Sequence, residues 1–391
     1  MIGSRLARHP APRMSIHDQV ITFIRNPEPG RFDALGVAVF RHQYDHVPAY
    51  RKYCAARGCK PSEVGVLAEV PPVSTVGFKY SELMSDEFSQ EAGGLVFTTS
   101  GTTQSSELRG RHFVARPDVY RESAVRHLRA MLFPDVERIS IVALHPAADA
   151  MAESSLAQMI SWAVEEFGAP ASACFATRAR IDVPAAVDSL RAFAARGEPV
   201  CVLGTTAAFA ALFDHLGDGA MAIRLTPGSR MMDTGGAKGQ LAPLVQEDVM
   251  ALAGARLGIE PYCVINEYGM TELCSQLYDS TALNSPGANG AASRTKIAPP
   301  WMRPFALDPV TLTALPDGNI GVLAFFDLAN VSSVSAVMTE DFGIIERGGV
   351  RVLGRAASGD SRGCALGIGE FAAVSTRPRV PSTRARMRAA R

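Results

Sequence analysis

The sequence of 391 residues lacks any imbalance of charge. Its 39 lysines and arginines are matched by 39 aspartates and glutamates, so the formal net charge is zero. This balance excludes a generally basic surface, which is what a non-specific nucleic-acid or anionic-membrane binder requires. We therefore expect no nucleic-acid partner.

Long apolar runs are also missing. The longest, residues 139–144 and 320–326, have the length of strands and fall far short of the ~20 residues of a membrane span. The first 14 residues contain three arginines and two prolines but no apolar segment typical of a signal peptide. These absences predict a protein with no membrane span and a cytoplasmic location.

The seven cysteines form no recognisable pairs. They are odd in number and scattered, and no C-x-x-C spacing occurs among them. Such a set is a poor disulfide framework and fits a reducing compartment. With 47% hydrophobic and 20% charged residues, the chain has the composition of an ordinary globular protein with a large core.

Strands alternate with helices through most of the chain. Segments 139–144, 200–203 and 262–265 read as buried strands, and segments 184–196, 206–213 and about 240–256 as helices. This alternation predicts an α/β fold with parallel sheets, flanking helices and a ligand site at the carboxyl ends of the strands. From about residue 300 the pattern changes to short strands with turns, which predicts a small antiparallel β layer.

These patterns divide the chain into four parts. We expect a disordered basic N-terminus at 1–14, an α/β core at 15–299, a β-rich closing subdomain with a hinge-like segment at 300–370, and a disordered basic tail at 371–391. Within the core, residues 281–299 are rich in Asn, Pro and Gly and predict a flexible loop.

Four motifs carry the chemistry. In Phe97-Thr-Thr-Ser-Gly-Thr-Thr103, hydroxyls on a glycine turn can cradle a polyphosphate, although no Walker A Gly-Lys-Ser/Thr closes the loop. In Asp233-Thr-Gly-Gly-Ala-Lys238, paired glycines permit the close approach of a flat ring or a phosphate. Taken alone, the first segment is more often an ordinary loop, and the second could be a tight turn.

The remaining two motifs supply side chains. Asn266-Glu-Tyr-Gly-Met-Thr-Glu272 follows a predicted strand and offers an aromatic plane, a hydroxyl and a carboxylate, and a carboxylate beside phosphates is a natural ligand of Mg²⁺. Met338-Thr-Glu-Asp341 is followed by Arg355, and a lone Asp or Arg of this kind is usually a surface residue.

Taken in order, the four motifs resemble those of the adenylate-forming superfamily of acyl- and aryl-CoA synthetases and luciferases. The resemblance implies that the first loop binds the triphosphate of ATP and that the glycine segment and the tyrosine lie beside the adenine. It also implies that the Thr-Glu pair binds phosphate and Mg²⁺. The aspartate, supported by the arginine, is implied to bind the ribose hydroxyls. On this chain the implied nucleotide-binding residues are Thr99, Ser100, Gly101, Thr102, Thr103, Gly235, Gly236, Ala237, Tyr268, Asp341 and Arg355, and Thr271, Glu272 (also the metal ligand) and Lys238 are implied in catalysis.

Further segments are similar to one family of this group, the acyl-protein synthetases of the LuxE type. They are Pro71-Pro-Val-Ser74 with Phe78-Lys79, Ser154-Ser-Leu156, Gly235-Gly-Ala-Lys-Gly239 and Ser361-Arg-Gly-Cys364. The resemblance implies that an acid is activated as acyl-AMP and that the acyl group then moves to a cysteine near the C-terminus, here Cys364, before it reaches an acceptor protein such as a reductase or an acyl carrier protein.

Two departures from the superfamily stand out. Where the phosphate loop usually continues with a lysine, this chain has Glu107, so the phosphate-binding charge has to come from elsewhere, with Arg109, Arg111 and Lys238 as candidates. The sequence also ends about 27 residues after Cys364, which predicts that no full C-terminal lid domain is present.

The principal prediction is an ATP- and Mg²⁺-dependent acyl-protein synthetase that acts on a carboxylic acid, with a fatty acid implied by the resemblance. A transferase that takes the acyl or aryl group from CoA and uses the same cysteine is the first alternative. A non-catalytic nucleotide-binding scaffold subunit is the second, and Glu107 is the observation that keeps both open.

Overall fold

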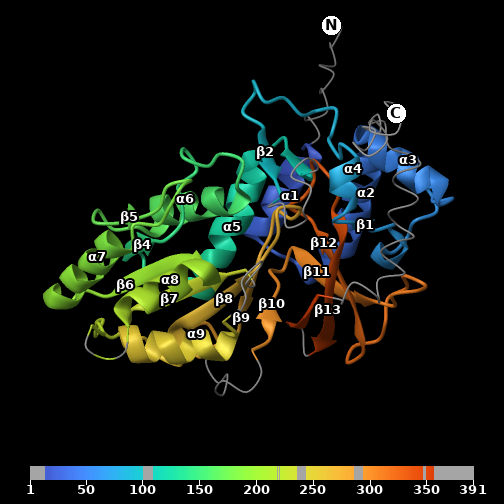
Figure 1. Cartoon of the computed structure of the whole chain (residues 1–391). Coiled ribbons are helices and arrows are strands. Elements are labelled where there is room, and N and C mark those ends of the chain that lie inside the picture. Colours follow the sequence, from blue (N-terminus) through green and yellow to red (C-terminus); the bar gives the residue numbers. More distant parts are fainter. Residues whose placement is uncertain are drawn as a thin grey trace, which may run out of the picture.

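The computed structural model describes residues 14–99, 109–217, 219, 221–235, 244–285, 294–346 and 349–355. Within these ranges the chain is a mixed α/β structure built on one large sheet (Figure 1). The predicted fold class is confirmed. The two termini that we expected to be disordered lie almost entirely outside the described residues, so that expectation stays a prediction.

The first part of the chain is helical. Its helices are α1 (Ile16–Arg25), η1 (Pro29–Arg31), α2 (Phe32–His46), α3 (Pro48–Ala56), η2 (Leu67–Glu69) and α4 (Gly77–Tyr80), with the short strand β1 (Val73–Ser74) before α4. Ser15 begins α1, because its side chain accepts a hydrogen bond from the backbone N–H of Asp18 at 3.1 Å and satisfies one free donor of the first turn. A two-stranded sheet of β2 (Leu95–Thr98) and β3 (Arg111–Val114) follows.

The middle of the chain alternates between strands and helices, as predicted. The elements are α5 (Pro117–Leu132), β4 (Ser140–Ala143), α6 (Ser155–Phe167), β5 (Ala173–Cys174), α7 (Val183–Arg196), β6 (Val200–Thr205), α8 (Thr206–Leu216), β7 (Arg230–Thr234), α9 (Gln246–Leu252), η3 (Ala253–Leu257), η4 (Pro261–Cys263) and β8 (Val264–Tyr268). Helix α7 ends at Gly197, which adopts a left-handed φ of 67° that favours glycine.

Strands β4 to β8 pair in parallel, in the order β8-β7-β6-β4-β5. The predicted strand at 262–265 begins two residues later than expected, because Pro261 starts a short 3-10 turn in front of it. In Figure 1 this parallel part, with α6 to α9, lies to the left, and the N-terminal helices with β11 to β13 lie to the right.

The last part is antiparallel and continues the same sheet. Its strands are β9 (Leu277–Asp279), β10 (Lys296–Ile297), β11 (Met302–Leu307), β12 (Ile320–Asp327), β13 (Ala336–Glu346) and β14 (Gly349–Arg355). Through β9 and β10 the order runs β11-β12-β13-β14-β10-β9-β8, so the antiparallel strands are joined edge to edge to the parallel ones. The expectation of a loop over 281–299 is wrong near its end, because Lys296 pairs with both β9 and β14 and Ile297 pairs with β9.

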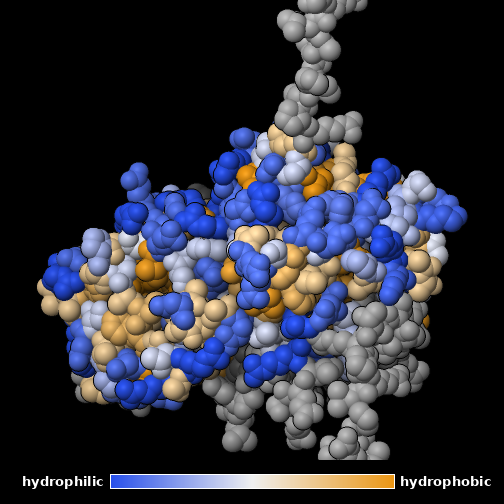
Figure 2. All heavy atoms as spheres, turned by 90° about the horizontal axis from the view of Figure 1, so that it is seen from above, coloured by the Kyte–Doolittle hydropathy of each residue, from blue (hydrophilic) through white to orange (hydrophobic). Residues whose placement is uncertain are grey.

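Among the described residues, eight large apolar side chains are exposed. On the face seen in Figure 2, hydrophilic residues surround and interrupt the apolar areas. In the part of the chain that the structure describes, no helix combines the length and the apolar character that crossing a membrane would require.

Candidate active site

A cavity of about 1070 Å³ opens where the parallel strands end. Its wall includes Thr206 after β6, Thr234 and Gly235 at the end of β7, and Glu267 and Tyr268 at the end of β8. The carboxyl ends of parallel strands meet at one edge of a sheet, and loops there can place side chains around a ligand. The cavity therefore lies at the edge that the strand–helix alternation predicted.

Seven of the predicted site residues line this cavity. They are Thr99, Gly235, Tyr268, Thr271, Glu272, Asp341 and Arg355. The predicted Ser100, Gly101, Thr102, Thr103, Gly236, Ala237, Lys238 and Cys364 lie outside the described residues. The structure thus brings together residues that are up to 256 positions apart in sequence (355 − 99), while the role of each remains a prediction.

The best-defined contact in the cavity joins β8 to β13. The hydroxyl of Tyr268 donates a hydrogen bond of 2.7 Å to Oδ2 of Asp341. Arg355 is paired with Asp341 across the β13–β14 ladder, and its Nε lies 3.8 Å from Oδ1. The phenol is protonated at neutral pH and acts as the donor, and burial raises its pKa further above the usual value. The carboxylate is therefore held in a fixed orientation.

Thr271 and Glu272 follow β8 in a turn whose backbone is anchored from outside the cavity. Nδ1 of His112 lies 2.7 Å from the carbonyl oxygen of Thr271, and the side-chain amide of Asn330 donates to the carbonyl of Glu272 at 2.8 Å. Nε2 of His112 in turn lies 2.8 Å from Oδ1 of Asn330. We identify His112 and Asn330 as positioning residues that the sequence motifs did not indicate, because their partners come from distant segments.

The glycine motif is supported by a small polar network. Gly235 has a φ of 83°, and its carbonyl accepts a 2.6 Å hydrogen bond from the hydroxyl of Thr206. The same hydroxyl donates to Asp233, which also accepts from the side chain of Asn266 at 2.9 Å. Burial raises the pKa of the Asp233 carboxyl. A positive φ is readily adopted only by glycine, which explains this residue type at the end of β7.

Glu267 points into the same region from β8. It is only 4% exposed, accepts a hydrogen bond from the Thr234 hydroxyl, and lines the cavity. Burial raises its pKa from the usual 4.5 to about 7, although Thr234 and the charge of Lys296 oppose that shift. Sequence inspection did not single it out, because it is one of several polar residues in the Asn266–Glu272 motif.

The cavity wall also carries several cationic side chains. Of the candidates predicted to supply the phosphate-binding charge, Arg109 and Arg111 do not line the cavity, and Arg111 pairs with Glu82 instead. Lys79, Arg294, Lys296, Arg351 and Arg355 do line it. Lys296 is held by Asp279 at 2.6 Å and by the carbonyl of Asn266 at 3.0 Å. It was missed because its loop-like surroundings gave no indication of strand β10.

A family model described as "Acyl-protein synthetase, LuxE" matches residues 27–372. Two curated proteins named long-chain-fatty-acid–luciferin-component ligase match shorter stretches: one from Vibrio harveyi is 35% identical over 79 residues, and one from Aliivibrio fischeri is 39% identical over 51 residues. The matches cover 18% and 13% of this chain, and only 21% and 14% of those proteins.

Among solved structures, an open conformation of 2-hydroxyisobutyryl-CoA ligase in complex with 2-HIB-AMP and CoA shares the fold. It superimposes with a TM-score of 0.59 over 84% of this chain and 79% of that one, at 14% identity. At this identity the likeness concerns the arrangement of helices and strands alone.

Proposed function

The chain belongs to the LuxE family of acyl-protein synthetases, and from this premise we propose that it activates a carboxylic acid with ATP and passes the acyl group on as a thioester. A carboxylate oxygen attacks the α-phosphorus of ATP, and pyrophosphate leaves with the electron pair of the broken P–O bond. The product, acyl-AMP, is a mixed anhydride whose carbonyl carbon is open to attack by a thiolate.

One observation carries this proposal. Tyr268, Asp341 and Arg355 share a wall of the cavity with the ends of β6, β7 and β8. An ionised carboxylate fixed by a protonated phenol can accept hydrogen bonds from two vicinal hydroxyls, which is what a ribose presents. A protein of the same fold, 2-hydroxyisobutyryl-CoA ligase, has been solved in complex with 2-HIB-AMP and CoA.

The residues on the wall also fit a magnesium ion. Mg²⁺ prefers oxygen ligands, and the Glu272 carboxylate with the Thr271 hydroxyl beside it offers a suitable donor set on the cavity wall. Bound there, the ion would neutralise charge on the phosphates of ATP. His112 and Asn330 hold the backbone that carries these two side chains, so they orient the donors before ATP arrives.

The acyl acceptor that we propose is Cys364, the cysteine implied by the family motif. The thiolate attacks the carbonyl carbon, AMP leaves, and a thioester forms. The six described cysteines are less suitable, because burial raises the pKa of every one of them, to about 12 for Cys54 and Cys201, and disfavours the thiolate.

A long-chain fatty acid is the substrate class that we favour. The cavity wall includes the apolar side chains of Leu156, Met159 and Met250. Val245 and Leu353 also line it, and they are 54% and 48% exposed. An alkyl chain that covered them would bury apolar surface at about 25 cal/mol per Å². The curated relatives carry a fatty acid in their names.

We propose that the final acceptor is a thiol on a partner protein, because a thioester on Cys364 is useful only if the acyl group moves on. The names of the two curated relatives give a luciferin component, and not CoA, as the second reactant.

Exchange of labelled pyrophosphate into ATP tests the first step. We expect exchange that depends on an added acid, with long-chain fatty acids better than short-chain or aromatic ones. A reaction without acid, and one with ATP but no Mg²⁺, are the controls. Complete absence of exchange across the panel would refute adenylation. If the intact mass then showed an adduct after acyl-CoA alone, the alternative CoA-dependent transfer would replace it.

A further inference from the structure

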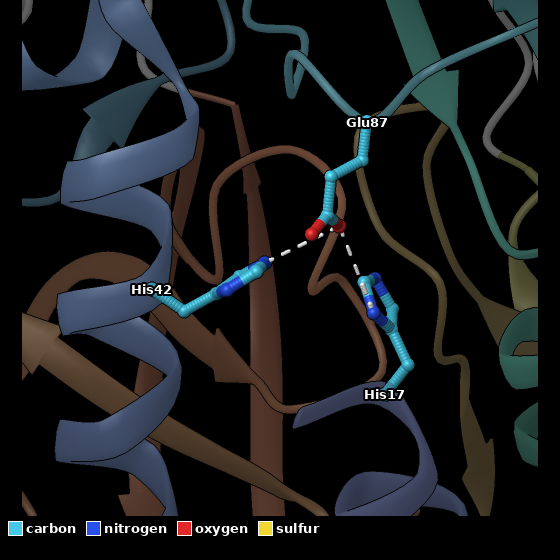
Figure 3. A group of neighbouring side chains, drawn as sticks. All are labelled: His17, His42 and Glu87. Carbon is cyan, nitrogen blue, oxygen red and sulfur yellow. Dashed lines mark ion pairs between the residues drawn. The ribbon is translucent and has the colours of Figure 1, made fainter. Parts of the chain in front are cut away.

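A second group of chemically active side chains lies apart from the cavity. His17 on α1, His42 on α2 and Glu87 in the segment between α4 and β2 converge, with both imidazole rings directed towards the carboxylate (Figure 3). None of the three lines the cavity described above. We propose that they form a binding site for a divalent transition-metal ion of the zinc type.

The ligand atoms are close enough for such an ion. Nδ1 of His17 and Nε2 of His42 lie 3.9 Å and 3.6 Å from Oε2 of Glu87, and all three ligand atoms lie within 4.8 Å of one another. Tetrahedral zinc with bonds of about 2.0–2.1 Å separates neighbouring ligand atoms by about 3.3–3.4 Å. The Glu87 oxygen lies about 0.2–0.6 Å too far from each imidazole nitrogen, and a shift of the 40% exposed Glu87 side chain can close this gap. The two imidazole nitrogens have to approach each other by less than about 1.5 Å.

The rings are in the form that binds metals. His17 is 5% exposed, and burial lowers its pKa to about 4, so the ring is neutral at physiological pH and keeps a lone pair for coordination. Burial also lowers the pKa of His42. Within the described residues, Nε2 of His42 is buried and has no hydrogen-bond partner. An unpaired buried polar atom is costly, and a metal ion at this position would satisfy it.

Neighbouring residues orient the ligands. The ring nitrogen of His17 that faces away from the site, Nε2, lies 3.4 Å from the Ser332 hydroxyl. Ser85 fixes the Glu87 segment, because its hydroxyl accepts from the backbone N–H of Glu87 at 3.2 Å while its own N–H donates to the Ser332 carbonyl at 3.1 Å. Hydrogen bonds of this kind around metal ligands set their orientation.

The ligand set favours zinc over Mg²⁺ or Ca²⁺, because two imidazoles suit a borderline-soft ion. An ion held by three protein ligands would fasten α1, α2 and the segment around Glu87 to one another, and through Ser332 to the loop before β13. Asn330 in that loop holds the backbone of Glu272. We therefore assign the ion a structural role that supports the candidate active site from outside.

Metal binding to the full chain tests this assignment. Protein freed of metal with a chelator is titrated with zinc chloride in competition with a chromogenic chelator, and its melting temperature is recorded with and without zinc. We expect a single zinc ion per chain and a higher melting temperature. Glu87→Gln and His42→Gln should each bind at least about tenfold more weakly. Glu91→Gln and His215→Gln, at two exposed positions, are the matched controls and should bind as the parent does.

Cobalt distinguishes this site from the cysteines. Co²⁺ held by two imidazoles and a carboxylate shows visible d–d bands without the near-ultraviolet sulfur charge-transfer band of a thiolate site. The proposal fails if the parent protein binds no zinc in competition with the chelator, if Glu87→Gln binds as tightly as the parent, or if bound cobalt shows the thiolate band.

Discussion

Replacing Asp341 by asparagine isolates the charge that we assign to ribose binding. Asparagine has the same size and keeps one acceptor oxygen for the Tyr268 hydroxyl, which now lies 2.7 Å from the carboxylate. Asp341 sits within the β13–β14 ladder and its side chain is 18% exposed, so the substitution changes the charge without opening a cavity. Any effect should therefore fall on nucleotide binding and not on folding.

The magnitude follows from hydrogen-bond energies. A hydrogen bond to a charged group contributes about 1.5–3 kcal/mol and a neutral one about 0.5–1.5 kcal/mol, so the loss of charge should cost about 1–2 kcal/mol. Since 1.4 kcal/mol corresponds to a factor of ten, the KM for ATP in pyrophosphate exchange should rise about 5- to 30-fold. Arg355 adds little to this figure, because it is half exposed and its Nε lies 3.8 Å away.

The assay is pyrophosphate exchange, first with the ATP concentration varied at saturating acid and then with the acid concentration varied at saturating ATP. The KM for ATP should change while the KM for the acid stays within about twofold. Tyr268→Phe, which frees the carboxylate but keeps the ring, should raise the KM for ATP by a smaller factor. Asp317→Asn, the same change at an exposed position that does not line the cavity, is the control. An unchanged KM for ATP in Asp341→Asn would refute the assigned role.

Four further predictions concern other residues. Glu272→Gln should abolish most exchange and raise the Mg²⁺ concentration needed for half-maximal rate, and an unchanged Mg²⁺ dependence would contradict its role as a ligand. Cys364→Ser should keep exchange but lose the hydroxylamine-labile adduct in intact mass after incubation with acid and ATP, and a persisting adduct would exclude it as the acyl relay. Asn330→Ala, which removes buried hydrogen bonds to Glu272, His112 and Val334, should lower the free energy of unfolding by about 2–4 kcal/mol and lower kcat, as urea denaturation and exchange would show. Burial raises the pKa of Glu267 from 4.5 to about 7, so between these pH values the folded state keeps a proton that the unfolded state has lost, and the free energy of unfolding falls as the pH rises. Glu267→Gln should therefore be more stable than the parent by up to about 3 kcal/mol near pH 8, and this difference should vanish near pH 4. A difference in urea unfolding that does not depend on pH would contradict this prediction.

Local pattern was sufficient for most of the α/β region. Val187, Leu190 and Phe193 are spaced to bury one face of α7, and Gly197 ends the helix in a left-handed conformation, so its bounds could be read directly. Strand β10 could not be predicted, because two residues in an Asn-, Pro- and Gly-rich stretch carry no periodic signal and become a strand only between β9 and β14.

The sequence by itself determined the chemical inventory of the candidate site: glycine where the end of β7 needs a positive φ, and a tyrosine, a glutamate and an aspartate in motifs whose order indicates an adenylate-forming enzyme. The motifs indicate which functional side chains are present, but they do not indicate which residues from distant segments bind and orient them. Only the tertiary structure decided that His112 and Asn330 fix the backbone of Thr271 and Glu272, and that His17, His42 and Glu87 meet. These contacts join segments that are remote in sequence, and their partners are chosen by packing, which no local pattern encodes.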